Sequence, residues 1–157
     1  MMFTPFEPKV NFRYKLHMNN IPVYMIKTSA LPSLEQGEII IDYINVDFKV
    51  KGKSRWQDIS VTLYDPITPS GAEEVHNWIR DFHHNSETGI DGYAFPANDG
   101  YKRDIKIEVL DPKGVPVETW SISGAFISSA NWGSMDWSSE DAKMIELNIK
   151  YDYAVLY

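Results

Sequence analysis

Residues 37–65, GEIIIDYINVDFKVKGKSRWQDISVTLYD, are the stretch that decides the fold. The part from Glu38 to Lys51 is rich in Ile, Val, Tyr and Phe and contains no proline, a composition that favours β-strands. As one strand this part would reach about 46 Å, at about 3.3 Å per residue. A globule of this chain length has a diameter of only about 39 Å. The stretch therefore predicts strands that one domain cannot easily cover, and a partner that is another copy of the chain.

Apolar residues alternate along this run, but their parity changes in the middle. The first set is Ile39, Ile41 and Tyr43, and the second set is Ile44, Val46, Phe48 and Val50. Because side chains alternate between the faces of a strand, the change requires a bulge or a turn between Asp42 and Asn45. The run is then either a long bulged strand or a hairpin that folds near Asn45 and projects as a flap. Both leave strand edge or apolar surface for another copy to cover. An ordinary pair of buried strands within one domain is the third interpretation.

Basic residues form one cluster, at the end of this run. They are Lys49, Lys51, Lys53 and Arg55. A tight reversal is predicted at residues 51–53, with Gly52 in a left-handed conformation. Charges placed this way discourage random pairing at a strand edge, and the alternative is contact with an acidic neighbour across a subunit boundary. The predicted inter-subunit hairpin comprises Ile39, Ile41, Tyr43, Ile44, Val46, Phe48, Val50, Lys51, Gly52, Lys53 and Arg55.

The composition restricts the class of protein. A chain of 157 residues predicts a single domain, residues 1–157, with a core that needs no crosslinks. The absence of cysteine excludes disulfides and thiolate metal sites. The net charge of −7 argues against a domain that binds nucleic acid by neutralising phosphates, although it permits a surface over which nucleic acid passes without binding. The sequence has neither a signal-peptide pattern nor an apolar stretch of membrane-spanning length, and we expect an intracellular, soluble chain.

Alternating apolar residues predict further strands. They cover residues 10–18, 22–28, 59–63, 101–110, 115–123 and 145–155. The first two strands are expected to form a hairpin around a turn at Asn19 and Asn20. Residues 86–100 and 128–141 are polar and contain glycine, and they are predicted to be long loops.

One helix is predicted after residue 70. Ser70 and Glu73 have the spacing of a capping box, which marks a helix start. The residues expected to pack this helix on a sheet are Val75, Trp78, Ile79 and Phe82. The helix is expected to end near His84 or Asn85. Many strands and one helix predict a mainly β protein, namely a β-sandwich or small barrel with one flanking α-helix and a long protruding hairpin.

Residue patterns that suggest catalysis or metal binding are no more frequent in this sequence than expected by chance. His76 and His83 lie two helical turns apart, too far to bind one ion, and His84 points elsewhere. A metal site that adds Glu73 or Glu87 remains the alternative to a solvated helix face. The sequence shows no nucleophile elbow and no glycine-rich phosphate loop. We therefore predict no catalytic, cofactor or metal site and no enzymatic activity. The alternative is an enzyme or ligand-binding sandwich that uses the two long loops as a pocket.

Several stretches, taken in order along the chain, carry a resemblance to a known family. They are residues 27–32 (KTSALP), 48–56 (FKVKGKSRW) leading into 59–65 (ISVTLYD), 101–104 (YKRD), 120–126 (WSISGAF), 136–139 (DWSS) and 145–154 (IELNIKYDYA). In order and spacing they resemble the tail tube proteins of contractile-tailed phages and the related tube proteins of contractile injection systems. The resemblance spans nearly the whole chain from about residue 10.

The resemblance implies a structural role. Six copies would join their inner sheets into a ring, and stacked rings would form a hollow tube whose hairpins, residues 38–53, cross the ring boundary. The implied partners are other copies of the chain, the tail sheath protein, baseplate or hub proteins and tail terminator proteins. DNA would pass through the lumen without specific binding, in agreement with the negative net charge. The protein would belong to the virion and assemble in the host cytoplasm. Near alternatives with the same fold are a tube initiator, a terminator cap and the inner tube of an injection system.

Overall fold

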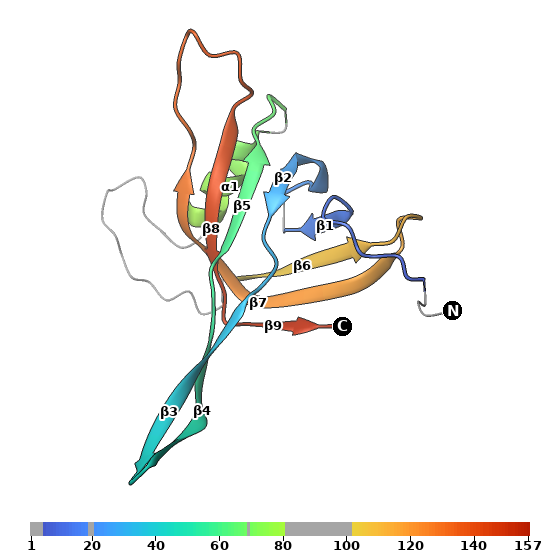
Figure 1. The fold of residues 1–157 in the computed structure, drawn as a ribbon. Helices are drawn as coiled ribbons and strands as arrows, with labels where there is room; N and C mark the ends of the chain where they lie inside the picture. The colour runs from blue at the N-terminus through green and yellow to red at the C-terminus, as the bar shows by residue number, and fades with distance from the viewer. Residues whose placement is uncertain (1–4, 19–20, 69, 81–101) are drawn as a thin grey trace, which may run out of the picture.

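The computed structural model of the chain describes residues 5–18, 21–68, 70–80 and 102–157 (Figure 1). The elements are β1 (Tyr14–His17), the 3₁₀ turn η1 (Val23–Met25), β2 (Ile26–Ser29), β3 (Leu34–Tyr43), β4 (Val46–Trp56), β5 (Ile59–Tyr64), α1 (Gly71–Arg80), β6 (Arg103–Leu110), β7 (Pro116–Asn131), β8 (Met144–Lys150) and β9 (Tyr153–Leu156). The mainly β class predicted from the sequence is confirmed.

The long strand β7 belongs to two sheets. Its first part pairs with β6 on one side and β9 on the other, and β1 pairs with β6, which gives the order β1-β6-β7-β9. Its second part pairs with β8, and the order continues through β5 to β2. In Figure 1, β6 and β9 run across the direction of β5 and β8. The body is therefore built from two crossed sheets that share one strand.

The shared strand turns its corner at Gly124, where φ is +69°. The chain between β8 and β9 turns at the same place, because the Asp152 backbone N–H donates to the Ser123 carbonyl at 3.0 Å. The prediction of one continuous strand over residues 145–155 is therefore wrong in one respect. The strand is interrupted at residues 151–152, where it follows β7 from one sheet to the other.

The core lies between the two sheets and is made of alternate strand residues. On β5 the three residues predicted to point inward, Ile59, Val61 and Leu63, are all buried. The other large fully buried side chains are Leu16, Met25, Val75, Trp78, Ile107, Ile122, Ile145, Leu147 and Ile149. These residues come from both sheets and from α1, so one core holds the body together.

Helix α1 begins as the capping-box spacing predicts. The Glu73 backbone N–H donates to Ser70 Oγ at 3.3 Å, and the Ala72 N–H donates to Asp65 Oδ1 at 3.2 Å. Val75 and Trp78 are buried, and Ile79 packs against the core while remaining half-buried. The Arg103 guanidinium lies 4.9 Å from the centre of the Trp78 ring. Phe82 and the predicted end of the helix lie outside the described residues.

The predicted first hairpin is wrong in its strand pairing, although Met18 and Ile21 form an isolated antiparallel bridge on either side of the predicted turn. Strand β1 pairs with β6, and β2 pairs with β5, so the two segments lie in different sheets. The strand predicted over residues 10–18 is also too long, because the chain turns at Asn11 and Phe12 and leaves Phe12 76 % exposed. Local alternation signals a strand but does not identify its partner, which only packing selects. In the described part of the chain, no helix is long and apolar enough to cross a membrane.

Candidate assembly surface

Strands β3 and β4 form a separate two-stranded sheet that projects from the body (Figure 1). They pair with each other from Leu34 opposite Trp56 to Tyr43 opposite Val46, and the chain turns at Ile44 and Asn45. The hairpin interpretation is therefore correct. A two-stranded hairpin alone is marginally stable in water, so a partner surface is expected to stabilise it.

The pairing register explains the change of apolar parity. Residues directly opposite each other share a face of the hairpin. The apolar pairs are Ile39 with Val50, Ile41 with Phe48, and Tyr43 with Val46. Their exposed fractions lie between 38 % and 67 %, and Ile44 at the tip is 100 % exposed. The two sets of opposite parity thus form a single apolar face, which we call the apolar hairpin face.

The other side of the hairpin is mainly polar. Glu38 lies opposite Lys51, Ile40 opposite Lys49, and Asp42 opposite Asp47. The hairpin is therefore amphipathic. Within the described part of the chain it pairs with no strand of the body, and its base reaches the core through Trp56, which packs beside Tyr151. An exposed apolar face of this kind marks a contact surface with a protein partner.

The sequence prediction about Gly52 needs correction. Strand β4 runs without interruption through residues 51–53, and Gly52 is not among the glycines with positive φ. Glycine is favoured there for another reason. The pairing register shifts between Gln36 and Glu38, and a Cβ on Gly52 would lie 3.0 Å from the carbonyl carbon of Gly37. The two strands therefore cross at close range, and a side chain at Gly52 would force the backbone near Gly37 to shift.

Replacement of Gly52 with Val is accordingly expected to impair the hairpin and spare the body. Overpacking of this kind costs about 1–3 kcal/mol, and here the cost falls on the β3–β4 pairing. We expect slower or incomplete assembly with an unchanged thermal unfolding midpoint of the two crossed sheets. Light scattering and circular dichroism measure the two quantities. Lys51→Val, on an exposed neighbouring position, is the matched control, and normal assembly of Gly52→Val would show that the close crossing is dispensable.

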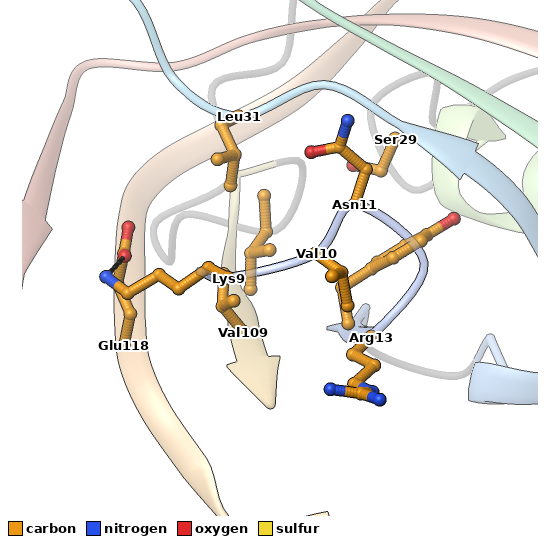
Figure 2. Close-up of a pocket in the computed structure, with 10 residues that line it drawn as sticks. Lys9, Val10, Asn11, Arg13, Ser29, Leu31, Val109 and Glu118 are labelled. Atoms are coloured by element: carbon orange, nitrogen blue, oxygen red, sulfur yellow. Dashed lines mark hydrogen bonds and ion pairs between the residues drawn. The ribbon is translucent and has the colours of Figure 1, made fainter. Parts of the chain in front are cut away.

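A pocket of about 460 Å³ lies between the N-terminal segment, the chain after β2, and strands β6 and β7 (Figure 2). Its apolar side chains include Val10, Leu31 and Val109. Its charged side chains are Lys9, Arg13 and Glu118, and the Lys9 ammonium forms an ion pair with the Glu118 carboxylate. The bond from Lys9 and a second hydrogen bond from Trp120 Nε1, at 2.6 Å, lower the pKa of Glu118. Glu118 is thus held as a carboxylate and is poorly suited to accept a proton from a substrate.

A second carboxylate network lies on the outward face of the β1-β6-β7-β9 sheet. Glu108 is buried, and its carboxylate bonds Lys106 and lies 3.2 Å from His17 Nε2. The bond from Lys106, and then that from His17, lower the pKa of Glu108 below its usual value. Within the described ranges, no group of three or more His, Cys, Asp or Glu side chains is placed to bind a metal ion. His83, His84 and Glu87, and the predicted loop 86–100, lie outside those ranges.

The loop between β7 and β8 carries a surface residue that sequence reasoning did not single out. Strand β7 runs to Asn131, so the loop covers residues 132–143 instead of the predicted 128–141. Trp132 packs against the core, whereas Trp137 is 107 % exposed and Met135 is also exposed. Only the structure separates these two tryptophans, because both follow polar residues in similar surroundings.

Comparisons with known proteins find similarity to phage tail tube proteins. The model of the family described as T4-like virus tail tube protein gp19 matches residues 10–155. A protein of Serratia phage KSP90 described as "Tail tube protein" is 22 % identical over 129 residues, which cover 82 % of this chain and 71 % of that protein.

Solved structures of tube terminators are among those that share the fold. A chain in the cryo-EM structure of the sheath/tube terminator of the PVC extracellular contractile injection system superposes with a TM-score of 0.75 and 20 % identity, over 98 % of this chain and 99 % of that one. A chain in the cryo-EM structure of the anti-feeding prophage cap, a tube-terminating cap, gives a TM-score of 0.76 and 17 % identity, over 99 % and 94 % of the two chains.

Proposed function

The chain belongs to the T4-like virus tail tube protein gp19 family, and from this premise we propose that its copies form six-membered rings that stack into a hollow tube. The amphipathic hairpin is the observation that carries the proposal. Its apolar face is exposed, and it projects away from the body (Figure 1). Contact with the next ring would bury that face, and because such a contact is heterologous it repeats without closing.

The ring itself would form through strand edges. Within the described residues, β1 pairs only with β6, and β9 pairs only with β7, so each end of the β1-β6-β7-β9 sheet has an unpaired edge. An unpaired edge is a template for a strand from another chain. Pairing of β9 with β1 of the neighbouring copy would continue the sheet around a ring.

The outward face of this sheet suits a DNA-conducting lumen. Small hydroxyl side chains, Ser121 and Ser123, lie among charges of both signs, Lys106 and Asp104. A surface with such a balance offers no continuous row of cations for phosphates. We therefore propose that this face lines the bore and that DNA slides along it without specific binding.

The remaining parts of the function follow from the family. As a phage tail tube protein the chain is a component of the virion. We propose that it assembles in the host cytoplasm, that its outer surface contacts the sheath, and that the ends of the tube contact the baseplate or hub and the tail terminator. We also propose that it acts without catalysis, since the family is structural. A tube initiator, a cap or an injection-system tube with the same fold is the alternative.

Negative-stain electron microscopy of the purified protein, at several concentrations, tests the proposal. Hollow tubes or rings with six-fold symmetry are the expected result. Growth of tubes without other components would favour the main tube subunit over an initiator or a cap. Small featureless particles at every concentration would contradict self-assembly, and a ligand screen against the pocket in Figure 2 would then be appropriate.

A further inference from the structure

The loop between β7 and β8 presents Trp137 in an ordered turn. Asp136 Oδ1 accepts hydrogen bonds from the Ser138 backbone N–H at 3.0 Å and from Ser138 Oγ at 2.8 Å. The Ser139 N–H donates to the Asp136 carbonyl at 3.3 Å. Trp137, at the centre of this turn, is fully exposed. An ordered loop that holds a tryptophan in water resembles a binding site for a partner, because tryptophan contributes strongly at protein interfaces.

The hairpin contains a hollow of about 480 Å³ at the crossing of Gly37 and Gly52. The two glycines leave bare backbone there, and Ile39 forms an apolar wall. Lys53 and Arg55 line the same hollow. A flat aromatic ring can lie on exposed glycine backbone, and cations beside it add a favourable contact with the ring.

The charges around the two features are complementary. The loop carries Asp136, Glu140 and Asp141, and Lys53 and Arg55 lie beside the hollow. In the described part of the chain, Glu140 and Asp141 form no ion pair, and neither do Lys53 and Arg55. Two acidic side chains also line the hollow. Glu38 lies opposite Lys51, and Glu35 lies opposite Arg55 and accepts a hydrogen bond from Gln57 Nε2 at 2.9 Å. Lys53 is therefore the cation of the hollow that has no acidic residue opposite it.

The two features cannot meet within one molecule. The loop between β7 and β8 and the β3–β4 hairpin lie at opposite ends of the body (Figure 1). A contact between them therefore requires two copies in a head-to-tail arrangement, which is the arrangement that builds an open filament.

We propose that Trp137 of one copy inserts into the Gly37–Gly52 hollow on the hairpin of a copy in the next ring, with the loop carboxylates facing Lys53 and Arg55. This inference rests on the proposed stacking of rings and names the two surfaces that meet. It gives a role to the basic residues at this point of β4 and to a tryptophan that is fully exposed in the single chain. The contact shares Ile39 with the apolar hairpin face and lies nearer to the body than the rest of that face.

Cysteine crosslinking tests the contact without interference from native thiols, because the chain contains no cysteine. The variant Lys53→Cys with Glu140→Cys places one thiol at the hollow and one in the loop, both on exposed positions. Treatment of assembled tubes with a short bis-maleimide should link copies into a ladder of dimers and higher multimers on denaturing gels. The control pairs Glu140→Cys with Lys113→Cys, which lies in the exposed turn between β6 and β7, and it should stay monomeric.

The outcomes separate this inference from the proposed function. Tubes whose Lys53→Cys/Glu140→Cys chains form no ladder would overturn the contact and leave the tube function standing. Failure of the unmodified chain to form rings or tubes would overturn both. A second variant, Trp137→Ala, should unfold at the unchanged temperature, since the ring has no buried surface to lose, but should lose most of its tube growth. Met135→Ala, on an exposed neighbour in the same loop, is the control and should grow normally.

Discussion

Replacement of Ile41 with Asp is expected to abolish tube growth and to leave the body folded. Ile41 lies on the apolar hairpin face, directly opposite Phe48. Its side chain is 42 % exposed in the single chain and is not part of the core cluster, so the core between the two crossed sheets should be unaffected. In a tube the carboxylate would be buried without a partner. Loss of one central apolar contact costs about 2–4 kcal/mol at an interface, which is a factor of roughly 30–1,000 in affinity at each ring contact.

Ile40→Asp is the matched control for this prediction. Ile40 is the adjacent residue of the same type, it is 51 % exposed, and it points to the polar side opposite Lys49. An aspartate there would face a cation and should permit assembly. Pelleting of tubes by ultracentrifugation and thermal melting by circular dichroism measure assembly and folding separately. Phe48→Asp and Ile44→Asp should behave like Ile41→Asp. Tubes of normal length from all three would remove the hairpin from the inter-ring contact.

The second large effect is expected at the corner of the fold, where Gly124→Ala should destabilise the body itself. A non-glycine residue at φ of +69° costs about 1–2 kcal/mol. The new Cβ would also lie 2.1 Å from Asp152 Oδ2 and 3.2 Å from Asp152 Cβ. Asp152 would have to turn away and lose its bonds from Lys102 Nζ at 3.0 and 2.9 Å. We expect a total of about 3 kcal/mol, and a midpoint lower by roughly 6–12 °C.

Gly114→Ala separates the two causes of that effect. Gly114 has a φ of +84°, but a Cβ there would meet no atom within 4 Å. It should therefore show only the backbone cost of about 1–2 kcal/mol. The difference between the two variants, measured by urea unfolding of each, reports the contact with Asp152. Equal losses of stability would mean that Asp152 moves freely and that the corner depends on φ alone.

The apolar pattern of residues 37–65 predicted most of the candidate surface. Period-two alternation marks every position of the apolar hairpin face, and the change of parity marks the turn between its strands. Capping likewise located the start of α1, because it depends on residues within four positions of each other. The predicted left-handed Gly52 was wrong, because a glycine can also be required by a neighbouring backbone, and that neighbour, Gly37, lies on another strand.

By itself the sequence determined the local features of this protein: which segments form strands, where the helix begins, that the hairpin has an apolar side, and that its family is one of tube proteins. Only the tertiary structure decided which strands pair. It placed β1 beside β6 and not beside β2, it interrupted the last strand where β7 turns at Gly124, and it left Trp137 in water while Trp132 joined the core. The physical reason is the separation in sequence between the residues that determine each feature. Alternation, capping and turns depend on a few neighbouring residues, whereas pairing and burial depend on segments that meet only when the whole core is packed.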